Sequence, residues 1–453
     1  MNETWDFVSF KDLIVERKDK FEPNSPEIEG LTKIEKIDFA EGRLHLGEYE
    51  PTKTQQIIVQ PGDFVFSGLN IEKGAVAFNE TGQRLVVSAN YSTCQYDDRK
   101  VSLDFFKHYM RSSNFQRLLK DNLKKDYGFT RPKHLLPLTF SVPKSKEEQS
   151  LIVRRFERSK NTLTQVTQEI AQQVDLVAKL KQAILQEAIT GRLTAGWRAA
   201  QTDVEPASQL LARIRAEKAR LVAAKKLRPE KPLPPIPESE IPFELPDGWG
   251  WCRFGDIQVG ADAGSSPKCD ERPVIGSEWG ILKVSATSGA RFNQDENKFF
   301  ADKLEPDHQA IVREGDFILS RANTKELVGN SVIVERLTKN LLLSDKTVRF
   351  RLTNHANKSF ANLVNKAKFV REHFIAGATG TSPSMKNISR ETILSHLLPL
   401  PPLREQTEIV ARVEGLMERC RELEAEIERS RAQAAALLQA VLREAFAPAT
   451  VAA

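Results

Sequence analysis

The sequence predicts an α+β protein in which two α/β modules follow one another as a tandem repeat, separated by two long helices that form an antiparallel coiled coil. Three observations lead to this prediction: an internal duplication, two long apolar stripes of helical period, and short β-like runs between Gly and Asn turns. A chain of 453 residues is too long for one compact core and suits two to four domains.

Both halves of the chain carry the same short motifs in the same order. Glu148-Gln149 aligns with Glu405-Gln406, and the similarity continues without a gap through segments 148–189 and 405–446. Farther upstream, Gly62–Ser67 matches Gly315–Ser320. A shared order of motifs indicates a tandem duplication. A third correspondence opens each half and pairs Trp5 with Trp249, Phe10 with Phe254, and Asp12 with Asp256.

Segments 148–189 and 405–446 are predicted to be long amphipathic helices. Their apolar residues follow alternating steps of four and three, which is the spacing of a coiled-coil seam. Each helix would be about 60 Å long and could not bury its own stripe. The simplest arrangement pairs the two helices; the alternative is two unrelated surface helices packed on separate domains. The stripes consist of Ile152, Phe156, Leu163, Val166, Ile170, Val177, Leu180 and Ile184, and of Ile409, Val413, Leu416, Cys420, Leu423, Ile427, Ala434, Leu437 and Val441.

The segments ahead of these helices, about 1–146 and 245–400, alternate short β-like runs with Gly and Asn turns. Each segment ends in a helical pattern, at Phe105–Leu119 and Ser359–Phe374. We therefore expect one α/β module in each segment. The predicted strands lie at Gln56–Val59, Phe64–Phe66, Ile281–Val284, Phe317–Leu319, Val332–Val334 and Thr347–Arg351.

The composition changes between the two halves. Pro206–Lys226 has the pattern of a short basic helix, and Arg228–Pro246 contains seven prolines that exclude a helix there. A basic helix is more often a solvated face than a DNA contact, and both interpretations stay open. The predicted domains are module 1 (1–146), spacer helix 1 (147–200), the basic helix with its Pro-rich linker (201–244), module 2 (245–401) and spacer helix 2 (402–447).

Composition and charge narrow the class of protein. The 66 basic and 61 acidic residues give a net charge of +5, which permits a nucleic-acid partner without requiring one. The four cysteines are scattered without a C-x-x-C pair, so we expect a reducing compartment and neither a disulfide scaffold nor a zinc ribbon. We find no pattern of a secretory signal or of a membrane span, and we expect a cytoplasmic protein.

The sequence contains none of the catalytic motifs that we searched for. It has no G-x-x-x-x-G-K-[ST], no G-x-G-x-x-G, no H-E-x-x-H and no G-x-S-x-G. It also lacks the Asn/Asp-Pro-Pro-aromatic run of amino-methyltransferases. We therefore expect a chain that is not an enzyme and that binds no metal or cofactor itself.

Polar and basic side chains in the two modules suit DNA reading. Arg and Lys bind guanine edges or neutralise phosphates, and Asn can pair with adenine, although an exposed Lys is usually only a solvated charge. Lys133 and Lys386 lie at the same distance from the repeated Gly-Asp-Phe motif, so a structural role in both modules is their alternative. The candidates are Lys53, Lys73, Arg84, Tyr127, Thr130, Arg131 and Lys133 in module 1, and Lys283, Arg291, Arg321, Asn323, Thr324, Lys325, Thr379, Thr381, Ser384 and Lys386 in module 2.

Several longer motifs together resemble those of Type I restriction–modification specificity subunits. The matching segments cover nearly the whole chain, but module 1 departs from the pattern: 144–149 lacks the Pro-Pro-Leu, and no Pro-x-Gly-Trp opens the chain. The segments that carry the resemblance are Gly191–Arg198, Ile241–Trp249, Arg321–Thr324 with Val328-Gly329, Lys386–Ser389 and Leu400–Gln406.

The resemblance implies a division of labour among subunits. Each module would be a target-recognition domain that reads one half of a bipartite, asymmetric site on double-stranded DNA. The coiled coil would set the spacer between the half-sites and dock two methyltransferase subunits, and restriction–translocase subunits would join the complex. S-adenosylmethionine, ATP and magnesium would be bound by these partners.

Two other functions remain open at this point. The first is a non-catalytic scaffold whose modules bind protein, with the coiled coil as its working part. Such a scaffold would show no salt-dependent binding to duplex DNA, whereas phosphate contacts produce a steep fall in affinity with salt. The second is a piece of a fused methyltransferase–specificity enzyme, which the missing donor and catalytic motifs disfavour.

Overall fold

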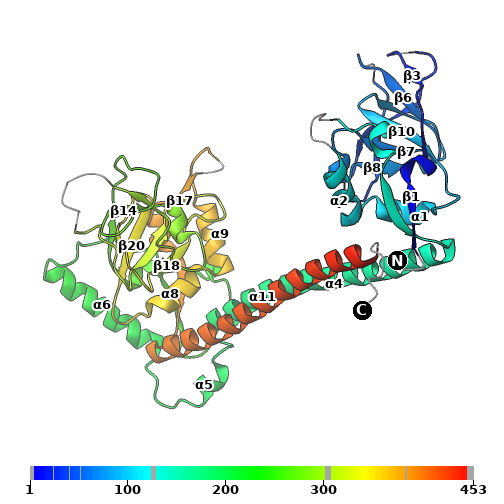
Figure 1. Cartoon of the computed structure of the whole chain (residues 1–453). Helices are drawn as coiled ribbons and strands as arrows, with labels where there is room; N and C mark the ends of the chain where they lie inside the picture. The colour runs from blue at the N-terminus through cyan, green and yellow to red at the C-terminus, as the bar shows by residue number, and fades with distance from the viewer. Residues whose placement is uncertain are drawn as a thin grey trace. The chain divides into compact units, whose positions relative to one another are not determined.

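The computed structural model describes residues 5–23, 25–39, 41–50, 53–123, 129–300, 308–382 and 385–445. These residues divide into two compact units (Figure 1). Unit 1 takes in the chain up to Gln173 together with the segment from Glu426 onward, and unit 2 comprises Val174–Ala425. Each unit therefore contains one module and a part of both long helices.

Unit 1 is built from three sheets and three short helices. The strands β1 (Trp5–Ser9) and β11 (Thr139–Pro143) pair antiparallel and bring the two ends of module 1 together. The four-stranded sheet has the order β2 (Ile14–Glu16), β10 (Tyr91–Tyr96), β7 (Phe64–Ser67), β8 (Val76–Phe78). The five-stranded sheet has the order β3 (Lys20–Phe21), β6 (Gln56–Val59), β9 (Leu85–Ser88), β4 (Thr32–Ile37), β5 (Leu44–Gly47). The helices are α1 (Leu103–Tyr109), α2 (Ser113–Asn122) and α3 (Pro132–Leu135), with 3-10 turns η1 (Phe10–Asp12) and η2 (Ile71–Lys73).

Unit 2 repeats the plan and adds a further sheet. β12 (Gly250–Arg253) pairs with β22 (Leu397–Leu400), and the four-stranded sheet has the order β13 (Gln258–Ala263), β20 (Thr347–Leu352), β16 (Phe317–Ser320), β18 (Ser331–Ile333). Two smaller sheets are β15 (Asn297–Phe299), β14 (Trp279–Leu282), β19 (Asn340–Leu342), and β17 (Ala322–Asn323) with β21 (Lys386–Asn387). The helices are α5 (Ala195–Ala199), α6 (Ala207–Ala223), α7 (Phe254–Ile257), α8 (Lys358–Asn365), α9 (Lys368–Ala376) and α10 (Arg390–Ser395), with 3-10 turns η4 (Glu238–Glu240) and η5 (Val284–Thr287).

The repeated Gly-Asp-Phe motif has the same structural role in both units. The Asp63 and Asp316 carboxylates accept hydrogen bonds from the backbone N–H groups of Gln60 (2.9 Å) and Arg313 (2.8 Å), which closes the turn before the central strand. Each carboxylate also pairs with an arginine, Arg17 at 2.6 Å in unit 1 and Arg349 at 3.0 Å in unit 2. The motif is therefore repeated because it fixes one turn and one ion pair of the four-stranded sheet.

The cores combine phenylalanines of the predicted strands, such as Phe64 and Phe317, with phenylalanines of other elements, such as Phe10 of η1 and Phe106 of α1. In unit 1, Phe10, Phe64, Phe106 and Phe140 are buried and pack ring against ring. In unit 2, Phe254 packs against Phe317 and Phe350. All six predicted strands are present, although β14 ends at Leu282 and the chain turns into η5 at Val284.

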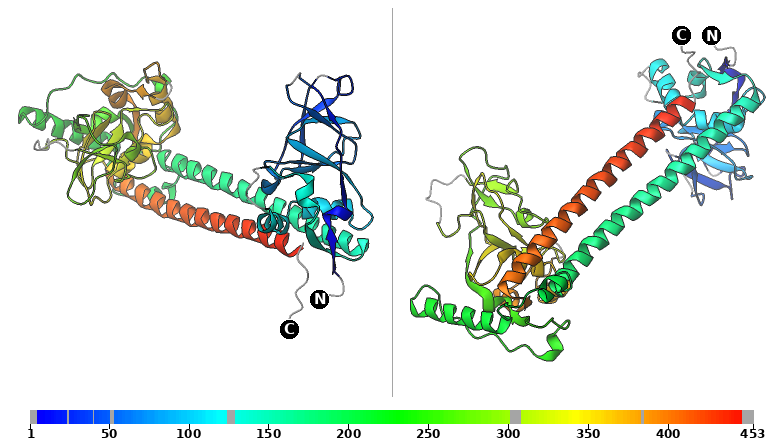
Figure 2. Two further views of the ribbon diagram at one scale, coloured as in Figure 1. Left: turned by 45° about the horizontal axis from the view of Figure 1, so that its top comes forward. Right: turned by 90° about the horizontal axis from the view of Figure 1, so that it is seen from below.

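The predicted long helices are confirmed as α4 (Lys146–Ile189) and α11 (Leu403–Ala445). Within each unit, the local segment of α4 runs alongside that of α11 (Figure 2). In unit 2, Lys181 pairs with Glu424 at 2.6 Å, and Thr194, just beyond α4, contacts Glu405 at the start of α11. From Lys181 to Thr194 the chain position increases, while the contacted residue moves back from Glu424 to Glu405, so these segments are antiparallel.

The buried seam of the long helices is narrower than the 4-3 stripe predicts. The fully covered positions recur in steps of seven, whereas Leu180, Leu423 and Leu437 are 44%, 43% and 55% exposed. Two helices fully cover only the side chains directly between them. The second position in each step of seven is exposed at these three leucines, half-buried at Ile152, Val166 and Leu416, and buried at Ile409. The covered positions are Phe156, Leu163, Ile170, Val177 and Ile184 on α4, and Val413, Cys420 and Ile427 on α11.

Each predicted helix at the end of a module is broken into two. Phe105–Leu119 becomes α1 and α2, because the Ser112 hydroxyl accepts a hydrogen bond from the backbone N–H of Phe115 and begins a new helix. Ser359–Phe374 likewise becomes α8 and α9, with Ala367 in extended conformation at the start of α9. The 3.6-residue period continues across both breaks, which is why the pattern did not reveal them.

Candidate nucleic-acid interface

In unit 2 the fold brings two of the predicted loops into one cluster. Asn323 of β17 lies opposite Lys386 of β21, and Thr379 forms a bridge to Asn387 through hydrogen bonds of 2.8 and 2.9 Å. The loop that carries Thr379 and Thr381 is thereby held against the loop that carries Arg321, Thr324 and Lys325. We call the described residues of these two loops, 321–325, 379–382 and 385–387, the β17–β21 cluster.

Three candidates in this cluster already have internal partners, and one of them is Thr379, whose hydroxyl donates to the Asn387 carbonyl at 3.3 Å. The Lys386 ammonium donates to the Gly380 carbonyl at 2.5 Å and closes its own hairpin. The Asn323 amide donates to the Ser288 hydroxyl at 3.0 Å, while its oxygen accepts the Thr324 N–H at 2.8 Å. Pairing of Asn323 with an adenine would therefore require the bond to Ser288 to break. The side chains of Arg321, Lys325, Thr379 and Thr381 are exposed.

The other two basic candidates of module 2 belong to neither of the two cluster loops. Lys283 donates to the Glu271 carbonyl at 3.3 Å, and Arg291 lies 3.9 Å from the Glu335 carboxylate. Lys283 lines a cavity together with Lys346, a residue that sequence reasoning missed. Lys346 belongs to no motif, and only the hydrogen bond from the Arg321 N–H to its carbonyl, 2.9 Å, places it near the candidates.

In unit 1 the segment that contains Thr130, Arg131 and Lys133 packs on the turn after β7. The Thr130 N–H donates to the Gly68 carbonyl at 2.8 Å, and this turn continues into η2, which carries Lys73. Arg131 begins α3 and places its guanidinium 5.5 Å from the Phe129 ring. Lys73, Arg131 and Lys133 are exposed.

Lys53 and Arg84 are not brought together. Lys53 precedes β6 and Arg84 precedes β9, and these strands pair antiparallel with Val59 opposite Leu85. The two candidates therefore lie at opposite ends of one ladder, and both are exposed. Tyr127 and Ser384 lie outside the described residues.

The structure corrects the proposed equivalence of Lys133 and Lys386. In unit 1 the carbonyl after β7 (Gly68) accepts from Thr130, and in unit 2 the carbonyl after β16 (Arg321) accepts from Ile388 at 2.9 Å. Thr130 thus corresponds to Ile388, both just before a short helix. Lys133 lies inside α3, whereas Lys386 lies on β21 ahead of α10. One repeat contains an insertion relative to the other. Lys133 and Lys386 are therefore not equivalent in the structure, although they lie equally far from the Gly-Asp-Phe motif in the sequence.

Three of the motifs that carry the family resemblance meet at one buried carboxylate in unit 2. Glu405, 1% exposed, accepts hydrogen bonds from the Thr194 hydroxyl (2.7 Å), the Arg198 guanidinium (2.9 and 3.1 Å) and the Trp249 indole (2.8 Å). The Arg198 guanidinium also lies 5.6 Å from the Trp249 ring. These residues come from 191–198, 241–249 and 400–406, so the motifs serve assembly of this junction.

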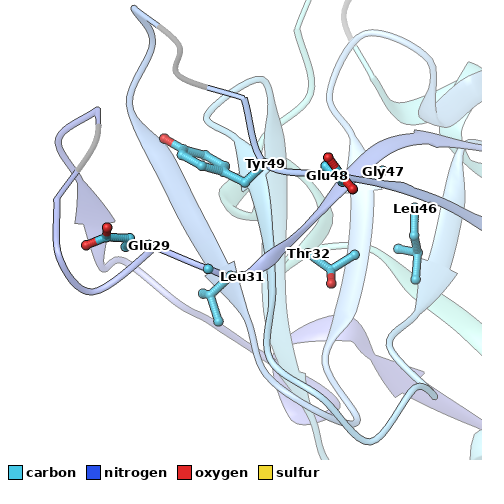
Figure 3. A pocket seen from close by; sticks show the side chains of 8 residues that line it. Glu29, Leu31, Thr32, Leu46, Gly47, Glu48 and Tyr49 are labelled. Atoms are coloured by element: carbon cyan, nitrogen blue, oxygen red, sulfur yellow. The ribbon is translucent and has the colours of Figure 1, made fainter.

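A cavity in unit 1 does not fit a phosphate. A cavity of about 780 Å³ lies beside β4 and β5, with Glu29, Leu31, Glu48 and Tyr49 among its lining residues (Figure 3). Its ionisable groups include two carboxylates, which repel phosphate, and it contains none of the predicted DNA-contact residues. Within the described parts of the chain, we find neither a cluster of side chains suited to a metal ion nor a helix long and apolar enough to cross a membrane.

Comparison of the sequence with known proteins gives a consistent set of relatives. The specificity subunit of the Type I restriction enzyme EcoEI from Escherichia coli is 36% identical over 274 residues, which are 60% of this chain and 45% of that protein. The EcoAI specificity subunit from Escherichia coli is 30% identical over 251 residues, 54% of this chain and 41% of that protein. The EcoKI specificity subunit of strain K12 is 23% identical over 352 residues, 77% of this chain and 66% of that protein. The matches to EcoEI and EcoAI thus span less than half of those relatives, and no protein-family model matches the chain.

Solved structures show the same fold. The HsdS subunit from Thermoanaerobacter tengcongensis superposes with a TM-score of 0.57 at 17% identity, over 98% of this chain and 97% of that one. A chain from a structural study of complex assembly and conformational transition in a Type I restriction–modification system gives 0.62 at 15% identity, over 98% of both chains. The chain is therefore similar in sequence to specificity subunits of Type I restriction enzymes and similar in fold to solved chains of Type I restriction–modification systems.

Proposed function

We propose that this chain is the DNA-recognition subunit of a Type I restriction–modification complex. Each module would read one half of a bipartite, asymmetric site on double-stranded DNA. One observation carries the proposal: the chain is similar to a specificity subunit, and its two modules share one arrangement. In each module, a loop with basic residues is held against the strand that follows the Gly-Asp-Phe turn. Two copies of one DNA-binding module suit a site with two different halves, because the loops of each copy can diverge in sequence while the sheets and helices of the module are kept.

The paired helices would serve as spacer and docking surface. Exposed Leu180, Leu423 and Leu437 offer apolar side chains to two methyltransferase subunits, and restriction–translocase subunits would complete the assembly. S-adenosylmethionine, ATP and magnesium would be bound by those partners, with this chain non-catalytic. We place the complex in the cytoplasm, a reducing compartment that agrees with four cysteines present as free thiols.

The experiment is co-expression with the methyltransferase encoded beside this gene, followed by genome-wide mapping of methylated adenines by single-molecule sequencing. A gapped, two-part motif is expected. Exchange of 245–401 for the corresponding region of another specificity subunit should change one half of the motif and leave the other intact. An assembled complex that methylates nothing would instead favour the protein-binding scaffold.

A further inference from the structure

A cavity of about 490 Å³ opens in unit 2 beside the β17–β21 cluster. Buried Ile281 and Leu282 line it, and so do three lysines, Lys283, Lys298 and Lys346. The Lys346 carbonyl accepts the Arg321 N–H at 2.9 Å, so the cavity adjoins the loop with the predicted base-reading residues. We call this the lysine cavity.

The positive charge of the lysine cavity is only partly balanced. The Glu271 carboxylate lies 2.5 Å from the Lys298 ammonium and 3.9 Å from that of Lys283, so one anion serves two cations. The Asp345 carboxylate also lines the cavity and accepts a hydrogen bond from the Ser266 hydroxyl, so three lysines stand against two carboxylates, those of Glu271 and Asp345. Among the described residues, no carboxylate forms an ion pair with Lys346, which leaves its ammonium available to an external anion.

These features suit a phosphate group. Ammonium groups bind phosphate as point charges, and the apolar lining reduces the screening that water would provide. Glu271 is 75% exposed, so its side chain can move into solvent when another anion takes its place. The cavity is joined to the β17–β21 cluster by the hydrogen bond from the Arg321 N–H to the Lys346 carbonyl, so a duplex bound by Arg321 would bring backbone phosphates near it.

We propose that the lysine cavity binds a backbone phosphate of the DNA next to the half-site read by module 2, and that this phosphate replaces Glu271 as the partner of Lys298 and Lys283. The inference rests on the proposed DNA-recognition function and deepens it. The contact is independent of base sequence and sets the register of the β17–β21 cluster on the duplex.

The test measures binding of the full chain to a duplex that carries its mapped site, over a series of salt concentrations. Lys298→Ala with Lys346→Ala should lower the slope of log K against log salt by about one, the value for one lost phosphate contact. Glu271→Gln should act in the opposite direction and tighten binding, because it frees two ammonium groups. The matched control is Lys368→Ala on α9, where the ammonium is 86% exposed and lies 3.8 Å from Glu372; it should leave the slope unchanged.

The opposite signs make the test robust, since a folding defect cannot tighten binding. An unchanged slope in the double lysine variant, or weaker binding by Glu271→Gln, would overturn the lysine cavity as a DNA contact while the function stands. A wild-type chain that binds no duplex with salt dependence would instead overturn the proposed function. Inorganic phosphate at constant ionic strength should compete poorly with the duplex; efficient competition would mark a free-anion site and would also overturn the inference.

Discussion

The Trp249 indole donates a hydrogen bond of 2.8 Å to the carboxylate of Glu405, a side chain that is 1% exposed. Trp249 follows the Pro-rich linker and directly precedes β12, and Glu405 lies in the first turn of α11. The Arg198 guanidinium, 24% exposed, balances the buried charge. One carboxylate therefore ties together the segment after α4, the entry to module 2 and the start of α11.

Replacement of Glu405 by Ala should strongly destabilise the chain. The change leaves the Arg198 guanidinium and two further donors without their buried acceptor, and breaking a buried pair in this way typically costs about 3–5 kcal/mol. Urea unfolding of the full chain, followed by circular dichroism, measures the effect. The matched control is Glu148→Ala, at the position of the first repeat that corresponds to Glu405. Glu148 is only half-buried and forms no ion pair within the described residues, so this variant should change the free energy of unfolding little. Equal losses from both variants would contradict this interpretation of the Glu405 junction.

Gln149 and Gln406 should each contribute to stability through the same pair of hydrogen bonds. Their side-chain oxygens accept the backbone N–H groups of Ser102 (2.7 Å) and Asn357 (2.8 Å), the cap residues of α1 and α8. Their amide nitrogens donate to the carbonyls of Pro143 (3.0 Å) and Pro401 (2.9 Å).

Gln149→Leu and Gln406→Leu should each lower the free energy of unfolding by about 1–3 kcal/mol, because each leaves a partly buried backbone N–H and a buried proline carbonyl without these partners. Thermal unfolding of the single variants measures this. Gln182→Leu, at an exposed position of α4, controls for the change in polarity. A loss from only one of the two buried glutamines would show that the repeats no longer share this contact.

His396 should make unit 2 sensitive to acid. The ring is fully buried and stacks on Phe254 at 5.0 Å, and burial lowers its pKa to about 3. Above pH 6.5 the residue is neutral in both the folded and the unfolded chain. As the pH falls from about 6.5 toward 3, the unfolded chain binds a proton that the folded chain refuses, so stability falls by up to ~1.4 kcal/mol per pH unit.

His396→Phe keeps an aromatic ring on Phe254 and removes the titration. Between pH 6.5 and 4.5, the free energy of unfolding should therefore fall less steeply in this variant than in the wild-type chain. Denaturant midpoints measured across this range give the slopes. His45→Gln, at an exposed position of β5, should keep the wild-type slope. Parallel curves for wild type and His396→Phe would rule out His396 as the source of the acid sensitivity.

The elements that follow from local pattern were predictable, and the contacts between distant segments were not. The heptad spacing was enough to place α4 and α11 to within a few residues. The Glu405 junction joins residues separated by up to 211 positions, and no local pattern identifies such partners. The same holds for Asn323. The sequence suggests that its side chain is free to contact DNA, but in the structure its amide donates a hydrogen bond to Ser288, 35 positions away in the chain. Sequence therefore identified the repeat and its helices, while the state of each loop side chain depends on tertiary contacts.

If the paired helices set the spacer of the DNA site, their length should determine it. Removal of 164–170 from α4 and 428–434 from α11 preserves the step of seven in both seams: Leu163 is then followed by Val177, and Ile427 by Val441, at the same interval. Each helix shortens by about 10 Å, which corresponds to roughly three base pairs of B-form DNA. Methylation mapping of the co-expressed complex should therefore yield the same two half-sites with a spacer about three base pairs shorter.

Removal of 164–170 alone serves as the control, because it mismatches the helices and should abolish assembly. An unchanged spacer in the matched deletion would show that the distance between the half-sites is fixed elsewhere than in these helices.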